Sequence, residues 1–163
     1  KDKKNPRVSV SVNGNTEYKG RGLKPSLYVF DLDTGEAITN YNYKVSYKNN
    51  KNVKTAGDKN PPTARVTFRN DYRGKAMATF DITVAMLNDY NVSITTADVK
   101  DTGKEITAEN IKTRIKFRNY TLKRGRDYDV TYKRDMNNYK QYFNVTFKGN
   151  FVGSATGSFN IYK

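Results

Sequence analysis

The second half of this chain repeats the first, and the duplication limits what the chain can fold into. The tripeptide Val66-Thr67-Phe68 returns 79 residues later as Val145-Thr146-Phe147. A shared pattern of aromatic, glycine and aliphatic residues follows both tripeptides at equal offsets: Tyr72, Gly74, Ala76, Phe80 and Ile82, then Phe151, Gly153, Ala155, Phe159 and Ile161. A repeat of about 80 residues is too long for a solenoid unit and suits two small domains in series.

A second matching segment lies upstream at a different spacing. Residues 43–48 return as residues 128–133, which is 85 positions later (Tyr43 to Tyr128). The difference between the two spacings corresponds to a longer loop in the first half, at residues 55–62. We therefore predict two domains, residues 1–85 and 86–163. No Gly/Ser-rich or Pro-rich linker separates them, so we expect a semi-rigid rod.

Alternation of apolar and polar residues dominates both halves and predicts β-strands. Gly and Asn residues suited to tight turns separate the alternating runs, for example at residues 13–15 and 148–150. Six or seven short strands in each half predict an all-β fold of two tandem β-sandwich domains. Residues 107–110 form a single helical turn at most. The predicted core residues are Val45, Tyr47, Val66, Phe68, Phe80, Ile82, Val130, Tyr132, Val145, Phe147, Phe159 and Ile161.

Composition removes several kinds of chemistry. The chain has no Cys and no His, which excludes disulfides, thiolate metal sites, cysteine nucleophiles and the usual neutral-pH base. An Asp-rich segment at residues 31–36 lacks the full ligand spacing of a calcium loop and is predicted to be a hairpin turn. No catalytic motif stands out. We therefore expect no enzyme activity, no cofactor and no metal.

The net charge of +14 favours anionic partners. No run approaches the roughly 18 apolar residues of a membrane span, so membrane insertion is not expected. Nucleic-acid binding is not expected either, because no helix is available to enter a groove and the aromatic pattern of single-strand binders is missing. The chain opens on Lys1 without an initiating Met, and we expect it to be a segment of a longer polypeptide.

One segment of the second half carries an alternating series of cations. They are predicted to share one face of one strand at steps of roughly 6.6 to 7 Å. Two interpretations stay open: a track for a polyanion, or an exposed or edge strand whose charges discourage aggregation. Residues 136–142 are the best candidate for an adhesive loop. The candidate polyanion- or glycan-binding residues are Lys112, Arg114, Lys116, Arg118, Tyr139 and Tyr142.

Several motifs of the second half resemble a known family. They are Asp101-Thr102-Gly103-Lys104-Glu105-Ile106, residues 121–133 with Arg124-Gly125-Arg126-Asp127-Tyr128-Asp129-Val130, and residues 145–161 with Lys148-Gly149-Asn150-Phe151-Val152-Gly153. These motifs resemble the bacterial Ig-like repeats of large Gram-positive surface proteins. The first half matches less closely and departs from the pattern at residues 39–41 and 55–62. The resemblance implies Ig-like sandwiches used as stalk or presentation modules, with no catalytic residues.

The resulting hypothesis is a non-catalytic spacer in a large bacterial surface or secreted protein, outside the cell, whose partners are the neighbouring domains of the same polypeptide. The alternative is an adhesin or carbohydrate-binding module. It would hold an anionic glycan, mucin or wall polymer through the basic strand and exposed tyrosines.

Overall fold

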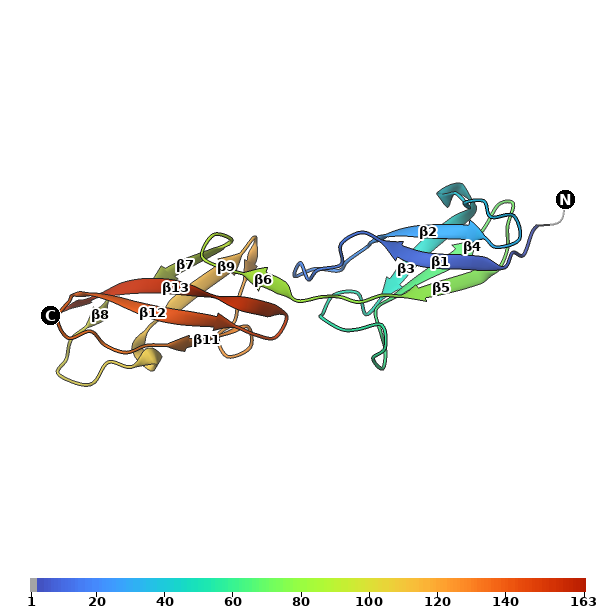
Figure 1. The fold of residues 1–163 in the computed structure, drawn as a ribbon. Helices are drawn as coiled ribbons and strands as arrows, with labels where there is room; N and C mark the ends of the chain where they lie inside the picture. The colour runs from blue at the N-terminus through green and yellow to red at the C-terminus, as the bar shows by residue number, and fades with distance from the viewer. Residues whose placement is uncertain (1–2) are drawn as a thin grey trace. The chain divides into compact units, whose positions relative to one another are not determined.

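The computed structural model describes residues 3–163, and contacts within the chain divide it into two compact units (Figure 1). The first unit extends to Thr83 and the second runs from Val84 to Lys163. Within the described residues, strands are the only regular structure apart from two single-turn 3-10 helices, which confirms the predicted all-β class. The division falls two residues before the predicted one because Ala85 pairs with Phe151 inside the second unit.

The first unit contains a two-stranded and a three-stranded antiparallel sheet. A single helical turn, η1 (Asn40–Asn42), precedes the three-stranded sheet. The strands, in sheet order, are β1 (Val8–Asn13) and β2 (Ser26–Asp31), then β3 (Tyr43–Lys48), β4 (Thr63–Phe68) and β5 (Lys75–Thr79).

The two sheets of the first unit enclose a shared core. Val29 of β2 and Val66 and Phe68 of β4 are buried in one cluster, and Val8 and Val10 of β1 pack against it. Successive side chains of a strand point to opposite faces, so each alternating run supplies one apolar face. The apolar faces of the two sheets therefore meet, and their polar faces are left to solvent, as in a β-sandwich.

The second unit has more strands, again in two layers. One layer is the three-stranded sheet β10–β9–β7, and the other is a larger sheet in the order β11–β12–β13–β6, with β8 also paired to β13. The bounds are β6 (Ala85–Leu87), β7 (Val92–Thr96), β8 (Val99–Lys100), β9 (Thr113–Phe117), β10 (Tyr120–Thr121), β11 (Tyr128–Thr131), β12 (Lys140–Phe147) and β13 (Phe151–Tyr162), with the helical turn η2 (Ala108–Asn110) before β9.

Aromatic contacts and hydrogen bonds join the layers of the second unit. The ring of Phe117 on β9 meets the ring of Phe151 on β13 edge-on, with 5.9 Å between centroids. The buried hydroxyl of Tyr128 on β11 lies 2.6 Å from Oγ1 of Thr113 on β9. The hydroxyl of Thr96 donates to the backbone carbonyl oxygen of Ser158 at 2.6 Å. These contacts fix the two sheets face to face.

Strand partners in the two units correspond at the spacings seen in the sequence. Antiparallel partners in the first unit have counterparts 85 and 79 residues later in the second. They are Tyr43 with Phe68 and Tyr128 with Phe147; Val45 with Val66 and Val130 with Val145; and Val66 with Ala76 and Val145 with Ala155. A parallel pairing corresponds as well. In the first unit Lys4 bridges Tyr72, and in the second unit Ala85 pairs with Phe151.

Three details differ from the sequence predictions. Within residues 3–163, five strands form in the first unit and eight in the second, rather than six or seven in each. The first unit has fewer strands because several of its pairings are single bridges between residues. Val45 and Val130 are only partly buried, since they lie on the edge strands β3 and β11. Tyr47 and Tyr132 are also half-buried, which lets their hydroxyls reach hydrogen-bond acceptors.

Candidate functional site

The basic series of the second unit does not lie on one strand. Strand β9 spans Thr113–Phe117, so it carries only Arg114 and Lys116. Lys112 precedes the strand, and Arg118 adopts a left-handed conformation with φ of 55° in the tight turn toward β10. The prediction of four cations on one strand is wrong because the chain must reverse direction at Arg118. Strand β9 is not at the sheet edge at Lys116 and Phe117, because β10 pairs with these two residues and β7 lies on the other side. Arg114 is exposed on this strand, as the interpretation of an exposed strand expects.

The predicted tyrosines lie elsewhere on the second unit. Tyr139 is 78% exposed in the loop before β12. Tyr142 belongs to β12 rather than to a loop and is 60% exposed on the outer face of the larger sheet. Arg114 and Lys116 lie on the outer face of the other sheet, because Ile115 and Phe117 turn inward. The structure therefore does not bring the predicted cations and Tyr142 together into one site.

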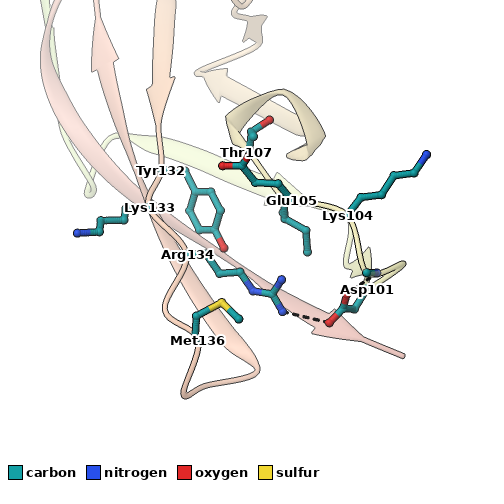
Figure 2. A pocket seen from close by; sticks show the side chains of 10 residues that line it. Asp101, Lys104, Glu105, Thr107, Tyr132, Lys133, Arg134 and Met136 are labelled. Atoms are coloured by element: carbon teal, nitrogen blue, oxygen red, sulfur yellow. Dashed lines mark hydrogen bonds and ion pairs between the residues drawn. The ribbon is translucent and has the colours of Figure 1, made fainter.

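A different set of residues surrounds a hollow of the second unit. A cavity of about 590 Å³ opens between the segment that follows β8 and the segment that follows β11 (Figure 2). A neighbouring hollow of about 410 Å³ shares part of this lining and includes Tyr139. Figure 2 shows Tyr132, Arg134 and Met136 on one side and Glu105 and Asp101 on the other.

An ion pair holds the two sides of this cavity together. Nη2 of Arg134 lies 3.1 Å from Oδ2 of Asp101. The backbone N–H of Gly103 and the Arg134 guanidinium both stabilise the charged carboxylate and hold the pKa of Asp101 below its ordinary value of 3.8. A carboxylate that stays ionised is poorly suited to donate a proton near neutral pH. The Nε of Arg134 is buried and has no hydrogen-bond partner in the described residues. The cavity therefore offers polar groups for binding rather than an obvious acid–base pair.

A buried glutamine supports the loop at the rim of the cavity. Gln141 is fully buried on β12, and its Oε1 accepts hydrogen bonds from the Tyr132 hydroxyl at 2.7 Å and the Asp135 N–H at 2.8 Å. Its Nε2 donates to the carbonyl oxygens of Asp135 and Asn138, both at 2.7 Å. Three of these hydrogen bonds join the Gln141 side chain to the backbone of the loop. They hold the loop, with its exposed Met136 and Tyr139, in a defined position.

Sequence patterns did not predict that Gln141, Arg134 and Asp101 belong to one site. A signal for Gln141 exists in the sequence, because it occupies an inward position in the series with Phe143, Val145 and Phe147. A polar residue at such a position must find hydrogen-bond partners. No comparable local signal links Asp101 to Arg134, which are 33 residues apart.

Replacing Gln141 with leucine is expected to destabilise the second unit by about 2 kcal/mol, since the four hydrogen bonds of this buried side chain to Tyr132, Asp135 and Asn138 are lost. The loop at residues 135–139 should gain mobility at the same time. Chemical denaturation and amide hydrogen exchange of the Asp135 N–H measure both effects. Tyr142→Leu on the exposed face of the same strand is the matched control. Equal stability of the Gln141→Leu variant and the wild type would show that the glutamine does not anchor the loop.

The acidic segment at residues 31–36 is a turn, as predicted. The buried carboxylate of Asp31 accepts the N–H groups of Asp33 and Thr34 and pairs with Lys4. The backbone carbonyl oxygen of Asp31 accepts the N–H of Gly35 at 2.7 Å, which closes the turn. Across residues 3–163, no three His, Cys, Asp or Glu residues gather closely enough to hold a metal ion.

Within the same residues, no helix has the length and apolar character required to cross a membrane. The chain matches no protein-family model, no curated protein and no solved structure.

Proposed function

We propose that the chain is a tandem pair of Ig-like β-sandwich domains that serves as a non-catalytic spacer in a large bacterial surface or secreted protein. The observation that carries this proposal is the repeated strand pairing. Tyr43 pairs with Phe68 in the first unit, and Tyr128 pairs with Phe147 in the second unit, in the same antiparallel arrangement. Each unit also has its own core. Duplication of a sandwich domain lengthens a protein without disturbing its fold, because each copy folds through its own contacts.

The motifs that resemble the bacterial Ig-like repeats support the same proposal. Residues 128–131 form β11, and residues 145–153 include the end of β12, a tight turn and the start of β13. The hydrogen bond between the hydroxyls of Tyr128 and Thr113 joins the two layers of the second unit, as a sandwich requires. The fold alone does not define an activity, and the spacer function depends on the mechanical properties of the pair.

The junction between the units is short. Thr83 bridges Glu17 in the first unit, and Ala85 pairs with Phe151 in the second, which leaves only Val84 between paired residues. The N–H groups of Thr83 and Ala85 also donate to Thr16 and Asn150 within their own units. We propose that a junction with one unpaired residue limits bending between the domains, which is what a spacer needs.

Insertion of Gly-Gly-Ser-Gly after Val84 tests this proposal. Small-angle X-ray scattering of the wild-type chain is expected to fit a narrow distribution of sizes, and the insertion should broaden the distribution because Gly/Ser segments are flexible. The same insertion in the exposed loop at residues 57–60 is the control, since it adds equal length away from the junction. Equally broad distributions for the wild type and the junction variant would contradict a spacer that resists bending.

The alternative of a binder for anionic glycan or wall polymer loses its predicted site, because the cations and Tyr142 lie on opposite outer faces of the second unit. The remaining cations of the predicted strand, Arg114 and Lys116, form a small charged surface. On the first unit, four cations share the outward side of one sheet.

A further inference from the structure

The outward side of the sheet β3–β4–β5 in the first unit is strongly basic. Its strands turn Ala64, Val66 and Phe68 inward, and the alternate positions face solvent. Four of the nine outward positions are cations and, within these described strands, none is acidic. We call this surface the basic face; its residues are Lys44, Ser46, Lys48, Thr63, Arg65, Thr67, Lys75, Met77 and Thr79.

The register of the sheet brings the four cations close together. Lys44 and Lys75 pair with Thr67 from either side, which places them two strand spacings apart, about 10 Å. Arg65 lies two residues from Thr67 on the middle strand, about 7 Å along the sheet. Lys48 lies four residues from Lys44, about 13 Å along β3. The four charges therefore fit within a patch that a few repeats of a charged polymer would cover.

The charges of the basic face are not balanced within the described chain. Lys44, Lys48, Arg65 and Lys75 have no ion pair with any acidic residue of residues 3–163. Asp81, which follows β5 by two residues, uses its carboxylate to accept the N–H of Ala56 at 2.7 Å. The four exposed charges create a local positive potential that attracts a polyanion, and a bound polyanion would neutralise it.

The second unit retains only one of the four cations, Lys133, which corresponds to Lys48 by sequence spacing. The positions equivalent to Lys44, Arg65 and Lys75 by sequence spacing and strand register hold Asp129, Asn144 and Ser154. Protection of sheet edges explains a lysine on the edge strands β3 and β5. It does not explain Arg65, because β4 is the central strand of the three.

We propose that the basic face binds a linear polymer that carries repeated phosphate or sulfate groups. Lys44, Lys48 and Lys75 act as mobile point charges, and the planar guanidinium of Arg65 can donate two parallel hydrogen bonds to one phosphate or sulfate. Flanking Ser46 and Thr67 supply hydroxyl groups for further hydrogen bonds. This binding is independent of the spacer function, and it would attach the first unit to an anionic surface layer.

The test uses the full chain with three probes: heparin as the sulfated polymer, poly(glycerol phosphate) as the phosphorylated polymer, and single-stranded DNA. The variant Lys44→Thr/Arg65→Asn/Lys75→Ser introduces at Arg65 and Lys75 the residues that the second unit already carries at those positions. We expect binding of one or both polymers to weaken by about tenfold, since each exposed ion pair contributes modestly. The slope of log affinity against log salt should fall by about 2, because three contacts are lost.

A matched variant, Lys112→Thr/Arg114→Ser/Arg118→Asn, removes the same charge from the second unit. Its affinity should stay within about twofold of the wild type, apart from the weak effect of net charge. Equal losses in both triple variants would overturn the proposal, because net charge alone would then explain binding. A loss confined to the matched variant, or no polymer binding by the wild type, would overturn it as well.

The remaining outcomes are also decisive. If the Lys44→Thr/Arg65→Asn/Lys75→Ser variant loses binding to heparin alone, the ligand of the basic face is a sulfated polymer. If this variant loses binding to poly(glycerol phosphate) alone, the ligand is a phosphorylated polymer. Tighter binding to single-stranded DNA than to either polymer would overturn the assignment. The reciprocal variant Asp129→Lys/Asn144→Arg/Ser154→Lys should raise the affinity about tenfold by creating a second basic face. Circular dichroism checks that each variant remains folded, so a folding defect is not mistaken for lost binding.

Discussion

Replacing Phe147 with alanine is expected to destabilise the second unit by about 3 to 5 kcal/mol, a large part of the stability of a small domain. Phe147 is buried at the end of β12 and pairs with Tyr128, which is itself buried. Removing the ring leaves a cavity between the two sheets, and the surrounding strands cannot close it without breaking their ladders. Denaturant unfolding measures the loss, and amide hydrogen exchange assigns it to the second unit.

Phe68 provides the matched control for this prediction. It occupies the equivalent position in the first unit, pairs with Tyr43, and is buried in the cluster with Val66. Phe68→Ala should therefore lower the exchange protection of the first unit and leave that of the second unchanged, which is the mirror image of Phe147→Ala. If either substitution lowered the protection of both units equally, the two cores would not be independent. If Phe147→Ala unfolded at the same denaturant concentration as the wild type, its assignment to the core would be wrong.

Gly153→Ala is expected to cost at least about 3 kcal/mol, because two effects combine at this position. Gly153 has a φ of +112°, a conformation that residues with a Cβ rarely adopt. A Cβ at Gly153 would also lie 2.1 Å from the carbonyl oxygen of Leu87, so the parallel pairing of β6 with β13 would have to open. Denaturant unfolding measures the loss of stability, and loss of amide protection in residues 85–87 identifies the strand that moves.

The equivalent glycine of the first unit separates the two effects. Gly74 has a similar φ of +104°, but the nearest atom to an added Cβ is the side-chain Oδ1 of Asn5, at 2.7 Å. A side chain can rotate away, so Gly74→Ala should cost only the backbone strain, about 1 to 3 kcal/mol. A larger loss for Gly74→Ala than for Gly153→Ala would contradict the role of the Leu87 contact.

Local patterns predicted much of what the structure contains. The predicted core residues Val66 and Phe68 alternate along β4 and are buried on its inner face. The predicted single turn at residues 107–110 is present as η2. These predictions succeed because a strand with one buried face shows its period of two in any short stretch of sequence.

The predicted site was less successful, and the reason lies in single residues. The alternation of cations continues through Arg118 and therefore predicted a single strand. Arg118 instead adopts a positive φ and reverses the chain. An alternating pattern does not reveal such a conformation at a residue other than Gly. Tyr142 was expected in a loop, yet it continues the ladder of β12. The basic face escaped notice because Lys44, Arg65 and Lys75 lie on three different strands.

The sequence by itself determined the all-β class and the burial of most of the predicted core residues, because these follow from residue spacing along one strand. The tertiary structure alone decided which strands are neighbours. It placed β6 parallel to β13, joined Asp101 to Arg134, and set Lys44 and Lys75 on either side of Thr67. Such neighbours depend on the pairing of segments distant in the chain, and no local pattern of residues encodes that pairing.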